Sequence, residues 1–312
     1  MRILVTGGAG FIGSNFIDHL FETESIQDLH VLVLDSLTYA GKMENLAHHL
    51  DKSNFEFIKG DIRDSELTDK LTQNVDAIVN FAAESHVDRS IGSSREFIET
   101  NVLGTQVLLE SARKNTVGKF LQISTDEVYG SIEVGSWDEN EPLLPNSPYA
   151  ASKASADLIV RSFNRTYGMF TLITRCSNNY GPRQDDEKLI PHFIGKLKKE
   201  EKVPLYGDGK NIRDWLFVRD HCDGILRVLL NGKSGEIYNI GGGRELTNTE
   251  ITKTLLSKFK LTEDYIQPVA DRLGHDRRYS VNWNKIKSEL GYSPKTNFET
   301  GIELTINWYA NH

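Results

Sequence analysis

A glycine-rich turn near the start of the chain constrains its fold more than any other feature. Residues 7–13 read Gly-Gly-Ala-Gly-Phe-Ile-Gly, directly after an apolar run at 2–6 and directly before a helical pattern. Glycine permits positive φ and lets backbone N–H groups approach a pyrophosphate, whose charge a helix N-terminus favours. The spacing fits both G-x-G-x-x-G and G-x-x-G-x-x-G, which in this context indicates a dinucleotide-binding strand–turn–helix unit.

An aspartate after the next apolar run indicates which dinucleotide is bound. Asp35 ends the run that begins at His30, and it follows Gly13 by 22 residues. A carboxylate there can accept hydrogen bonds from ribose hydroxyls and would repel a 2′-phosphate. We therefore expect NAD rather than NADP, although an aspartate that caps a turn or helix is the competing interpretation.

Short apolar runs alternate with helical patterns through the first half of the chain, which predicts an α/β fold with a doubly wound Rossmann-type parallel sheet. The expected strands are 2–6, 30–34, 55–59, 77–81, 119–124 and 170–175, and the expected helices are 11–21, 66–73, 97–115 and 149–167. Loops then lengthen. We expect a NAD-binding Rossmann domain over 1–176 and a smaller, mainly substrate-binding C-terminal lobe over 177–312, with 236–240 returning to the main sheet.

Composition excludes several classes of protein. The net charge of −8 argues against a nucleic-acid or anionic-membrane partner. The two cysteines make neither a disulfide framework nor a thiol metal motif, which favours a reducing compartment. Because no signal-peptide pattern opens the sequence and no apolar run has the length of a membrane span, we expect a cytoplasmic protein.

A tyrosine and a lysine four residues apart are candidates for acid–base chemistry. Tyr149 and Lys153 would share one helix face, and the preceding strand ends at Ser124-Thr125. A neighbouring ammonium and a bound nicotinamide cation would both lower the pKa of the tyrosine, which would make it a usable base. Considered alone, the spacing is common and fits a solvent-exposed Tyr/Lys pair better than a catalytic one.

These features together resemble the extended short-chain dehydrogenase/reductase superfamily over essentially the whole chain. Asp126-Glu127, directly after the fifth strand, resembles the Thr-Asp-Glu motif of the dTDP-glucose 4,6-dehydratases, whereas sugar-nucleotide epimerases of the superfamily lack this acidic pair. Other stretches similar to the dehydratases are 37–41, 83–90, 147–153, 175–182, 205–209 and 271–276. Leu273 departs from the pattern, because the family often has proline there.

The resemblance implies a redox-neutral cycle on a sugar nucleotide. Tyr149, assisted by Thr125, takes the O4 proton while hydride passes from C4 to NAD. Glu127 then removes the C5 proton and Asp126 protonates the departing C6 hydroxyl, after which the hydride returns to C6. The product would be dTDP-4-keto-6-deoxyglucose, a precursor of rhamnose or another deoxysugar. Asp126 must stay protonated for this role, which requires burial or a like-charged neighbour.

The resemblance also implies binding residues. Arg213 and Arg272 should face the diphosphate, with Asn178 nearby. Besides Tyr149 and Lys153, the expected cofactor-binding residues are Gly7, Gly10, Phe11, Ile12, Gly13, Asp35, Ser36, Leu37, Thr38, Asp61, Ile62, Phe81, Ala82, Ala83, Ser85, Thr100, Ser124 and Asn179. The other expected substrate-binding residues are Ser85, Thr125, Lys188, Leu189, Pro204, Leu205, Tyr206, Asn248 and His275.

Three alternatives stay open: a UDP-glucose 4-epimerase, a 4,6-dehydratase of another sugar nucleotide, and a non-catalytic NAD-binding regulatory protein. We expect no metal site, because the adjacent His48 and His49 would point in different directions on a helix. By analogy with the superfamily we expect a homodimer that pairs through the helices at 97–115 and 149–167.

Overall fold

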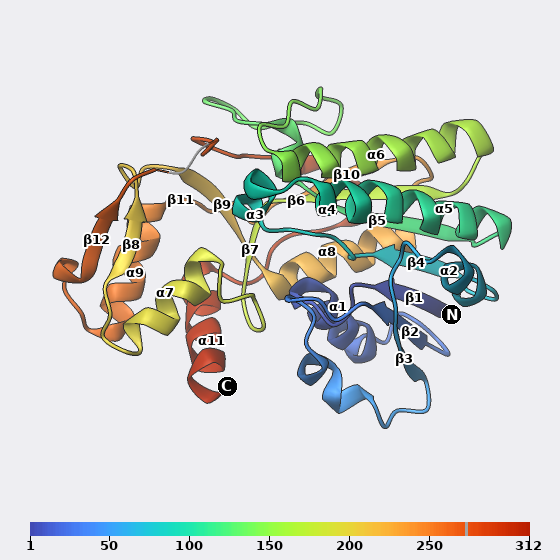
Figure 1. The fold of residues 1–312 in the computed structure, drawn as a ribbon, viewed down its shortest axis with the longest axis horizontal. Coiled ribbons are helices and arrows are strands. Elements are labelled where there is room, and N and C mark those ends of the chain that lie inside the picture. Colours follow the sequence, from blue (N-terminus) through green and yellow to red (C-terminus); the bar gives the residue numbers. More distant parts are fainter. Residues whose placement is uncertain (272–273) are drawn as a thin grey trace.

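The computed structural model describes residues 1–271 and 274–312. Its centre is a parallel seven-stranded sheet in the order β10-β6-β5-β4-β1-β2-β3 (Figure 1). These strands are β1 Arg2–Thr6, β2 His30–Asp35, β3 Phe55–Lys59, β4 Ala77–Asn80, β5 Lys119–Thr125, β6 Thr171–Cys176 and β10 Ile237–Ile240. The six strands expected in the first half are present, so the predicted doubly wound fold is confirmed.

Successive side chains of each strand point to opposite faces of the sheet, so the apolar runs supply apolar side chains to both faces. On β1, Ile3 and Val5 belong to one core cluster while Leu4 belongs to another. The first core lies under helices α1 (Phe11–Glu22) and α8 (Val218–Asn231), and the second lies under α5 (Thr105–Lys114) and α6 (Pro148–Tyr167). Burial on both faces explains why the strands are continuous apolar runs.

The strand order reverses between β1 and β4, which both pair with their neighbours in parallel register. Ligands of doubly wound sheets bind outside the carboxyl ends of the strands at such a switch point. The residues that follow β1, β2, β4 and β5 therefore meet in one place.

The predicted helix at 97–115 is divided into three segments. A short α4 (Arg95–Phe97) leads into a π-helical turn, η2 (Ile98–Gly104), before α5 begins. The remaining helical elements of the first half are η1 Met43–His49, α2 Ser65–Leu71, α3 Val87–Gly92 and η3 Asp126–Tyr129. Single π-turns inside helices occur frequently at functional sites.

The second half of the chain builds a smaller lobe and also contributes to the main sheet, because β10 pairs with β6. The lobe has its own core around Tyr180, Phe193 and Leu255. The division of the chain at residue 177 stays a prediction. Elements of this half, besides α8 and β10, are β7 Asn178–Tyr180, α7 Leu189–Leu197, β8 Val203–Tyr206, β9 Ile212–Phe217, β11 Glu245–Thr247, α9 Asn248–Phe259, η4 Glu263–Tyr265, β12 Ile266–Val269, α10 Asn284–Leu290 and α11 Phe298–Asn311.

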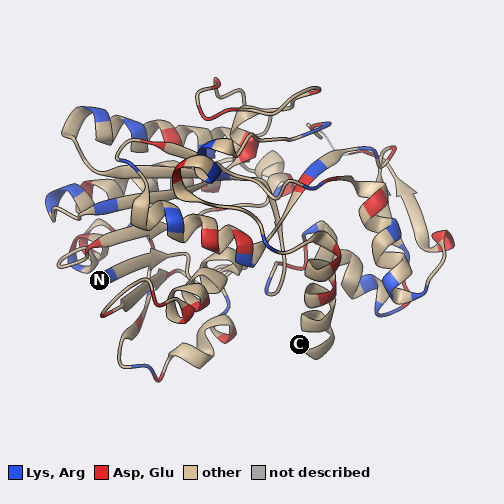
Figure 2. Cartoon of the chain, turned by 180° about the vertical axis from the view of Figure 1, so that it is seen from behind, with Lys and Arg blue, Asp and Glu red and all other residues tan. Residues whose placement is uncertain are grey.

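Acidic and basic residues are interspersed along the helices of both lobes (Figure 2). Within the part of the chain that the structure describes, no helix is long and apolar enough to cross a membrane.

Candidate active site

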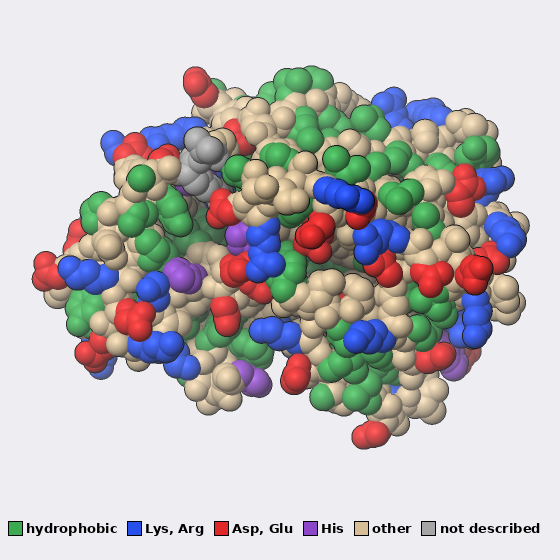
Figure 3. Space-filling view, viewed as in Figure 1, with side chains coloured by type: hydrophobic (Ala, Val, Ile, Leu, Met, Phe, Trp, Pro, Cys, Tyr) green, Lys and Arg blue, Asp and Glu red, His purple; other side chains and the backbone are tan. Residues whose placement is uncertain are grey.

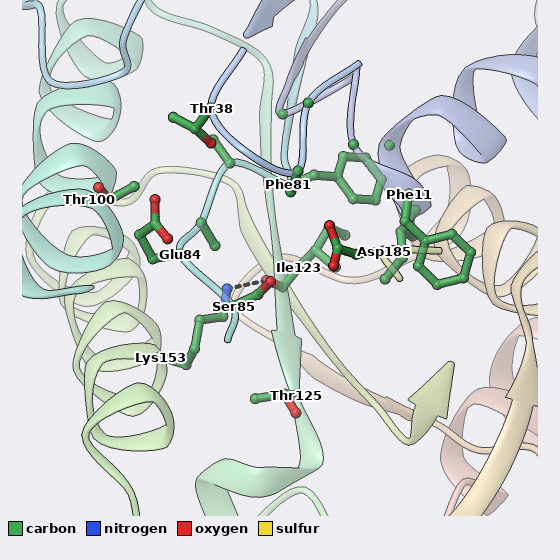
Figure 4. Close-up of a pocket in the computed structure, with 18 of the residues that line it drawn as sticks. Phe11, Thr38, Phe81, Glu84, Ser85, Thr100, Ile123, Thr125, Lys153 and Asp185 are labelled. Atoms are coloured by element: carbon green, nitrogen blue, oxygen red, sulfur yellow. Dashed lines mark hydrogen bonds between the residues drawn. The ribbon is translucent and has the colours of Figure 1, made fainter. Parts of the chain in front are cut away.

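A cavity of about 680 Å³ lies at the carboxyl ends of the main-sheet strands. Its wall includes residues that follow β1, β2, β4 and β5, and residues 177–179, 184, 185 and 188 of the second half (Figure 4). The volume is in the range of ligand-binding clefts. The cavity therefore joins the predicted dinucleotide turn and the predicted catalytic residues in one site.

The glycines of the turn let it pack closely against neighbouring backbone. Gly7 has a φ of +67°, and a Cβ added there would lie 2.6 Å from the backbone nitrogen of Ala82. A Cβ on Gly13 would lie 2.3 Å from the carbonyl oxygen of Gly7. Helix α1 begins after Gly10 with no side-chain cap and no acidic residue in its first turn. Its N-terminal N–H groups can therefore bind an anion such as a pyrophosphate.

Asp35 is buried at the end of β2 and lines the cavity. Its carboxylate accepts hydrogen bonds from the backbone N–H groups of Ala9 at 2.9 Å and Leu37 at 2.8 Å. Burial raises the pKa of Asp35, and these two hydrogen bonds oppose the rise. Each carboxylate oxygen keeps acceptor capacity for ribose hydroxyls.

Several buried polar atoms in the cavity wall have no hydrogen-bond partner among the described residues. They include the hydroxyl of Ser124 and the side-chain oxygens of Asn178 and Asn179. Buried polar atoms are normally satisfied, so unpaired ones indicate a ligand or water in the cavity. Together with the glycine turn and Asp35, they fit a dinucleotide.

Tyr149 and Lys153 both reach the cavity from helix α6. Lys153 Nζ donates a hydrogen bond to the carbonyl oxygen of Ile123 at 2.7 Å (Figure 4). Burial raises the pKa of Tyr149 well above its usual value, and the charge of Glu127 adds to the rise. The expected lowering by Lys153 does not appear in the protein alone, because burial and carboxylates dominate the surroundings of the phenol.

The acidic pair lies beside this tyrosine, on the 3-10 turn η3 that follows β5. The turn begins where the Thr125 hydroxyl accepts a hydrogen bond from the backbone N–H of Glu127 at 3.3 Å. Asp126 is 2% exposed, and its Oδ2 has no hydrogen-bond partner among the described residues. Burial raises the pKa of Asp126 well above its usual value, and the neighbouring Glu127 raises it further. The structure thus favours the protonated form of this carboxyl.

Most of the residues expected from the sequence line the cavity. All five expected catalytic residues do so, as do all expected cofactor-binding residues except Leu37. Leu37 has a left-handed φ of 53°, and its side chain packs against the core. Of the expected substrate-binding residues, those in the wall are Ser85, Thr125, Asn178 and Lys188.

The other expected substrate-binding residues that the structure describes lie in the second half of the chain, outside this cavity wall. Arg213 is buried on β9, where its Nη2 donates to the carbonyl oxygen of Asp276 at 2.9 Å and its guanidinium stacks on Tyr279. The charge of Arg213 opposes the rise in the pKa of Asp126, so Arg213 lies within electrostatic range of the acidic pair. Arg272 lies outside the described residues. The remainder of this group are Leu189, Pro204, Leu205, Tyr206, Asn248 and His275.

The sequence analysis missed Asn101, which braces the site from the π-turn η2. Its Oδ1 accepts from the N–H of Glu84 at 2.8 Å, and its Nδ2 donates to the carbonyl oxygen of Glu84 at 3.0 Å and to Ser152 Oγ at 2.8 Å. Asn101 thereby links the segment after β4 to helix α6. An asparagine inside a helical pattern was the available signal, because it is a weak helix former.

One argument from the sequence is wrong. His48 and His49 do not point apart, because the Nε2 atoms of both lie 2.7 Å from Oδ1 of Asp18. The two residues end a 3-10 turn whose side chains fold back onto α1. This convergence gives a cluster of three groups of metal-ligand type, Asp18, His48 and His49.

Comparison with known proteins identifies the family. A family model described as GDP-mannose 4,6 dehydratase matches residues 4–305. A dTDP-glucose 4,6-dehydratase from Streptomyces antibioticus is 53% identical over 315 residues, covering 100% of this chain and 93% of that protein. The chain belongs to the dTDP-glucose 4,6-dehydratase family.

Two solved structures, one of a dehydratase and one of an epimerase, have folds similar to that of this chain. The Streptomyces venezuelae dTDP-glucose 4,6-dehydratase DesIV, solved with NAD and TYD bound, has a TM-score of 0.98 and 54% identity, covering 100% of this chain and 97% of that one. A UDP-glucose 4-epimerase from Thermotoga maritima has a TM-score of 0.91 and 33% identity, covering 100% and 99%. The fold is therefore common to dehydratases and epimerases, and the side chains in the cavity must distinguish them.

Proposed function

We propose that this chain is an NAD-dependent hydro-lyase that converts dTDP-glucose to dTDP-4-keto-6-deoxyglucose and water. The observation that carries the proposal is the buried Asp126 beside Glu127 in the same cavity as Tyr149 and Lys153. Elimination across C5 and C6 needs one group that removes a proton and another that supplies one. An epimerase has no use for such a pair.

The residues that line the cavity fit NAD. The turn from Gly7 to Gly13 would hold the pyrophosphate, and Asp35 would accept hydrogen bonds from the adenosine ribose. When bound, NAD accepts the C4 hydride of the sugar and returns it to C6 within one turnover. Lys153, whose Nζ donates a hydrogen bond to the carbonyl oxygen of Ile123, would bind the nicotinamide ribose.

Tyr149 and Thr125 would act on the sugar O4. The buried phenol is neutral in the protein alone, since its pKa is raised by burial and by Glu127. A cation that enters the cavity lowers this pKa, because it favours the phenolate. Tyr149 can therefore take the O4 proton only beside bound, oxidised cofactor, while the Thr125 hydroxyl orients that oxygen.

Asp126 and Glu127 would carry out the elimination. Glu127 would remove the C5 proton, which the C4 ketone acidifies, and Asp126 would give its proton to the departing C6 hydroxyl. Burial and the charge of Glu127 both keep Asp126 protonated, as this role requires. After water leaves, Glu127 returns a proton to C5.

The lobe built by the second half of the chain would hold the nucleotide. We assign Asn178, Lys188, Arg213 and Arg272 to the diphosphate by the family resemblance, since arginine matches its geometry. The other assigned substrate contacts are Ser85, Leu189, Pro204, Leu205, Tyr206, Asn248 and His275. The relatives at 53% and 54% identity act on dTDP-glucose, which favours thymidine over another nucleotide.

We also propose a cytoplasmic homodimer that pairs through α6 and the η2–α5 helix. Apolar side chains gather over this face of the molecule (Figure 3). Ile98 is 55% exposed, Leu103 49% and Leu158 53%, which is unusual for large apolar side chains on adjacent helices. Pairing of two such faces would bury these side chains as a four-helix contact.

The test is incubation of the purified protein with dTDP-glucose in deuterated water, followed by mass analysis of the sugar nucleotide. We expect loss of one water and one solvent deuterium fixed on carbon, at C5. An unchanged dTDP-glucose together with conversion of UDP-glucose to its C4 epimer would establish an epimerase instead. Protein that carries NAD but turns over neither sugar nucleotide would favour a regulatory role.

A further inference from the structure

We propose that Asp18 is a positioning residue for the cofactor cavity: through Arg183 it holds the turn at 181–185 against helix α1. The proposal rests on the proposed function only in taking this cavity to bind a dinucleotide. Asp18 lies outside the cavity wall, on the helix that begins at the glycine turn. The turn that it contacts belongs to the second half of the chain and leads directly into the wall.

The Asp18 carboxylate is the centre of a partly buried polar junction. Its Oδ2 lies 2.8 Å from Nη1 of Arg183, and the two side chains are only 13% and 15% exposed. Its Oδ1 is shared by His48 and His49. Burial alone would raise the pKa of Asp18, but the hydrogen bond with His49 and the charge of Arg183 lower it overall. The groups around Asp18 therefore stabilise its ionised carboxylate.

The turn that Asp18 holds is strained. Arg183 has a φ of 71°, in the left-handed region that costs a residue with a Cβ about 1 kcal/mol. A second contact from α1 helps to fix it, because the buried Asn15 donates a hydrogen bond from Nδ2 to the carbonyl oxygen of Pro182 at 3.1 Å. Strained conformations persist only where the surrounding structure over-determines them, and they cluster at functional sites.

The last two residues of this turn form part of the cavity wall. Gln184 and Asp185 both line the cavity. Nε2 of Gln184 donates to the carbonyl oxygen of Asn179 at 2.8 Å, and Oδ1 of Asp185 accepts from the N–H of Glu187 at 2.9 Å. A shift at Arg183 would therefore move the wall that faces the glycine turn. Asp18 thus couples the helix beneath the pyrophosphate site to the opposite wall.

The same junction has the donor atoms of a zinc site, but its charges oppose a metal ion. Nζ of Lys52 lies 2.8 Å from Nδ1 of His49, and Arg183 occupies the second oxygen of Asp18. Two cations within contact of the ligands would repel a divalent ion. Ligation through Nε2 would also place a proton on Nδ1, facing the Lys52 ammonium. The geometry therefore points to a junction built around the carboxylate.

The decisive experiment is hydrogen–deuterium exchange of Asp18→Asn, with exchange of the peptide 178–190 as the primary readout. Asparagine keeps the shape but loses the charge. We expect exchange in 178–190 about tenfold faster than in the unaltered protein, and release of NAD about tenfold faster, with the strands of the main sheet unchanged. Asp51→Asn, at an exposed position, is the matched control and should change neither rate.

Arg183→Met keeps the proposal testable if one variant fails to fold. We expect it to reproduce both effects of Asp18→Asn, and the double variant to be no worse than either single one. Exchange in 178–190 at the unaltered rate in both single variants would overturn the proposal, as would full additivity in the double variant. A failure of the proposed function would appear separately, as absence of turnover in the unaltered protein, and would leave the exchange result readable.

Discussion

Asp126 shows how one buried carboxyl can set both the chemistry and the stability of the protein. Its side chain is 2% exposed and lies next to Glu127, so burial and the charge of Glu127 both disfavour the ionised carboxylate. A carboxyl whose pKa is raised in the folded state stabilises the fold fully at pH values below its unfolded pKa. That contribution is lost as the pH rises through the folded pKa.

Replacement of Asp126 by asparagine should therefore stabilise the protein increasingly as the pH rises. The unaltered protein should lose up to about 1.4 kcal/mol per pH unit relative to the variant, from about pH 4 up to the folded pKa. Urea unfolding of both proteins at pH 5 and pH 8 measures this difference, with the exposed Asp28→Asn as control. If the two proteins differ in free energy of unfolding by the same amount at both pH values, the burial argument is contradicted.

The same Asp126→Asn variant should turn over dTDP-glucose about 10²–10⁴-fold more slowly, because the general acid is lost.

At the scale of elements, the π-turn η2 determines how the catalytic helix is held. Asn101 at 1% exposure makes three hydrogen bonds that join Glu84 to Ser152 on α6. Ser152 Oγ in turn donates to the carbonyl oxygen of Tyr149 at 2.7 Å. The interrupted helix therefore brings an asparagine to the point where the cofactor wall and the catalytic helix meet.

Asn101→Ala should lower the free energy of unfolding by about 2 kcal/mol, because it leaves the partly buried backbone N–H and C=O of Glu84 without their partner. Turnover should fall while the KM for dTDP-glucose changes little, since the contacts affected orient catalytic groups. Urea unfolding and steady-state kinetics test both effects. Asn115→Ala, a polar truncation near the end of α5, is the control that should leave the kinetics unchanged. Unaltered kinetics in Asn101→Ala would show that η2 has only a structural role.

The same scale shows what the sequence could and could not predict. Continuous apolar runs predicted the main strands because both faces of the sheet are covered, and the glycine spacing predicted the turn after β1. The π-turn was not predicted, because one extra residue in a helix leaves almost no trace in hydrophobic periodicity. The convergence of His48 and His49 on Asp18 was missed because it depends on packing of η1 against α1. Leu37, expected at the cofactor by resemblance, has a left-handed φ and a side chain that packs against the core, so only its backbone is placed to meet the cofactor, and that contact stays a prediction.

At the scale of the whole molecule, the exposed apolar face over η2, α5 and α6 predicts the oligomeric state. Leu158→Lys should dissociate the proposed dimer, because a charge would be buried at its centre. Light scattering coupled to size exclusion measures the mass. Leu304→Lys, at a 46% exposed position on α11 outside this face, should leave the mass unchanged. A monomer in the unaltered protein, or a dimer in both variants, would contradict the assignment of this face.

In the proposed cycle, one cavity performs an oxidation, an elimination and a reduction on the same sugar. Conversion of dTDP-glucose labelled with deuterium at C4 tests it most directly, with the position of the label in the product read by NMR. We predict that the deuterium is recovered at C6 of a 4-keto-6-deoxy product, carried within one active site. Deuterium retained at C4 of an epimerised sugar, or lost to solvent, would contradict the account.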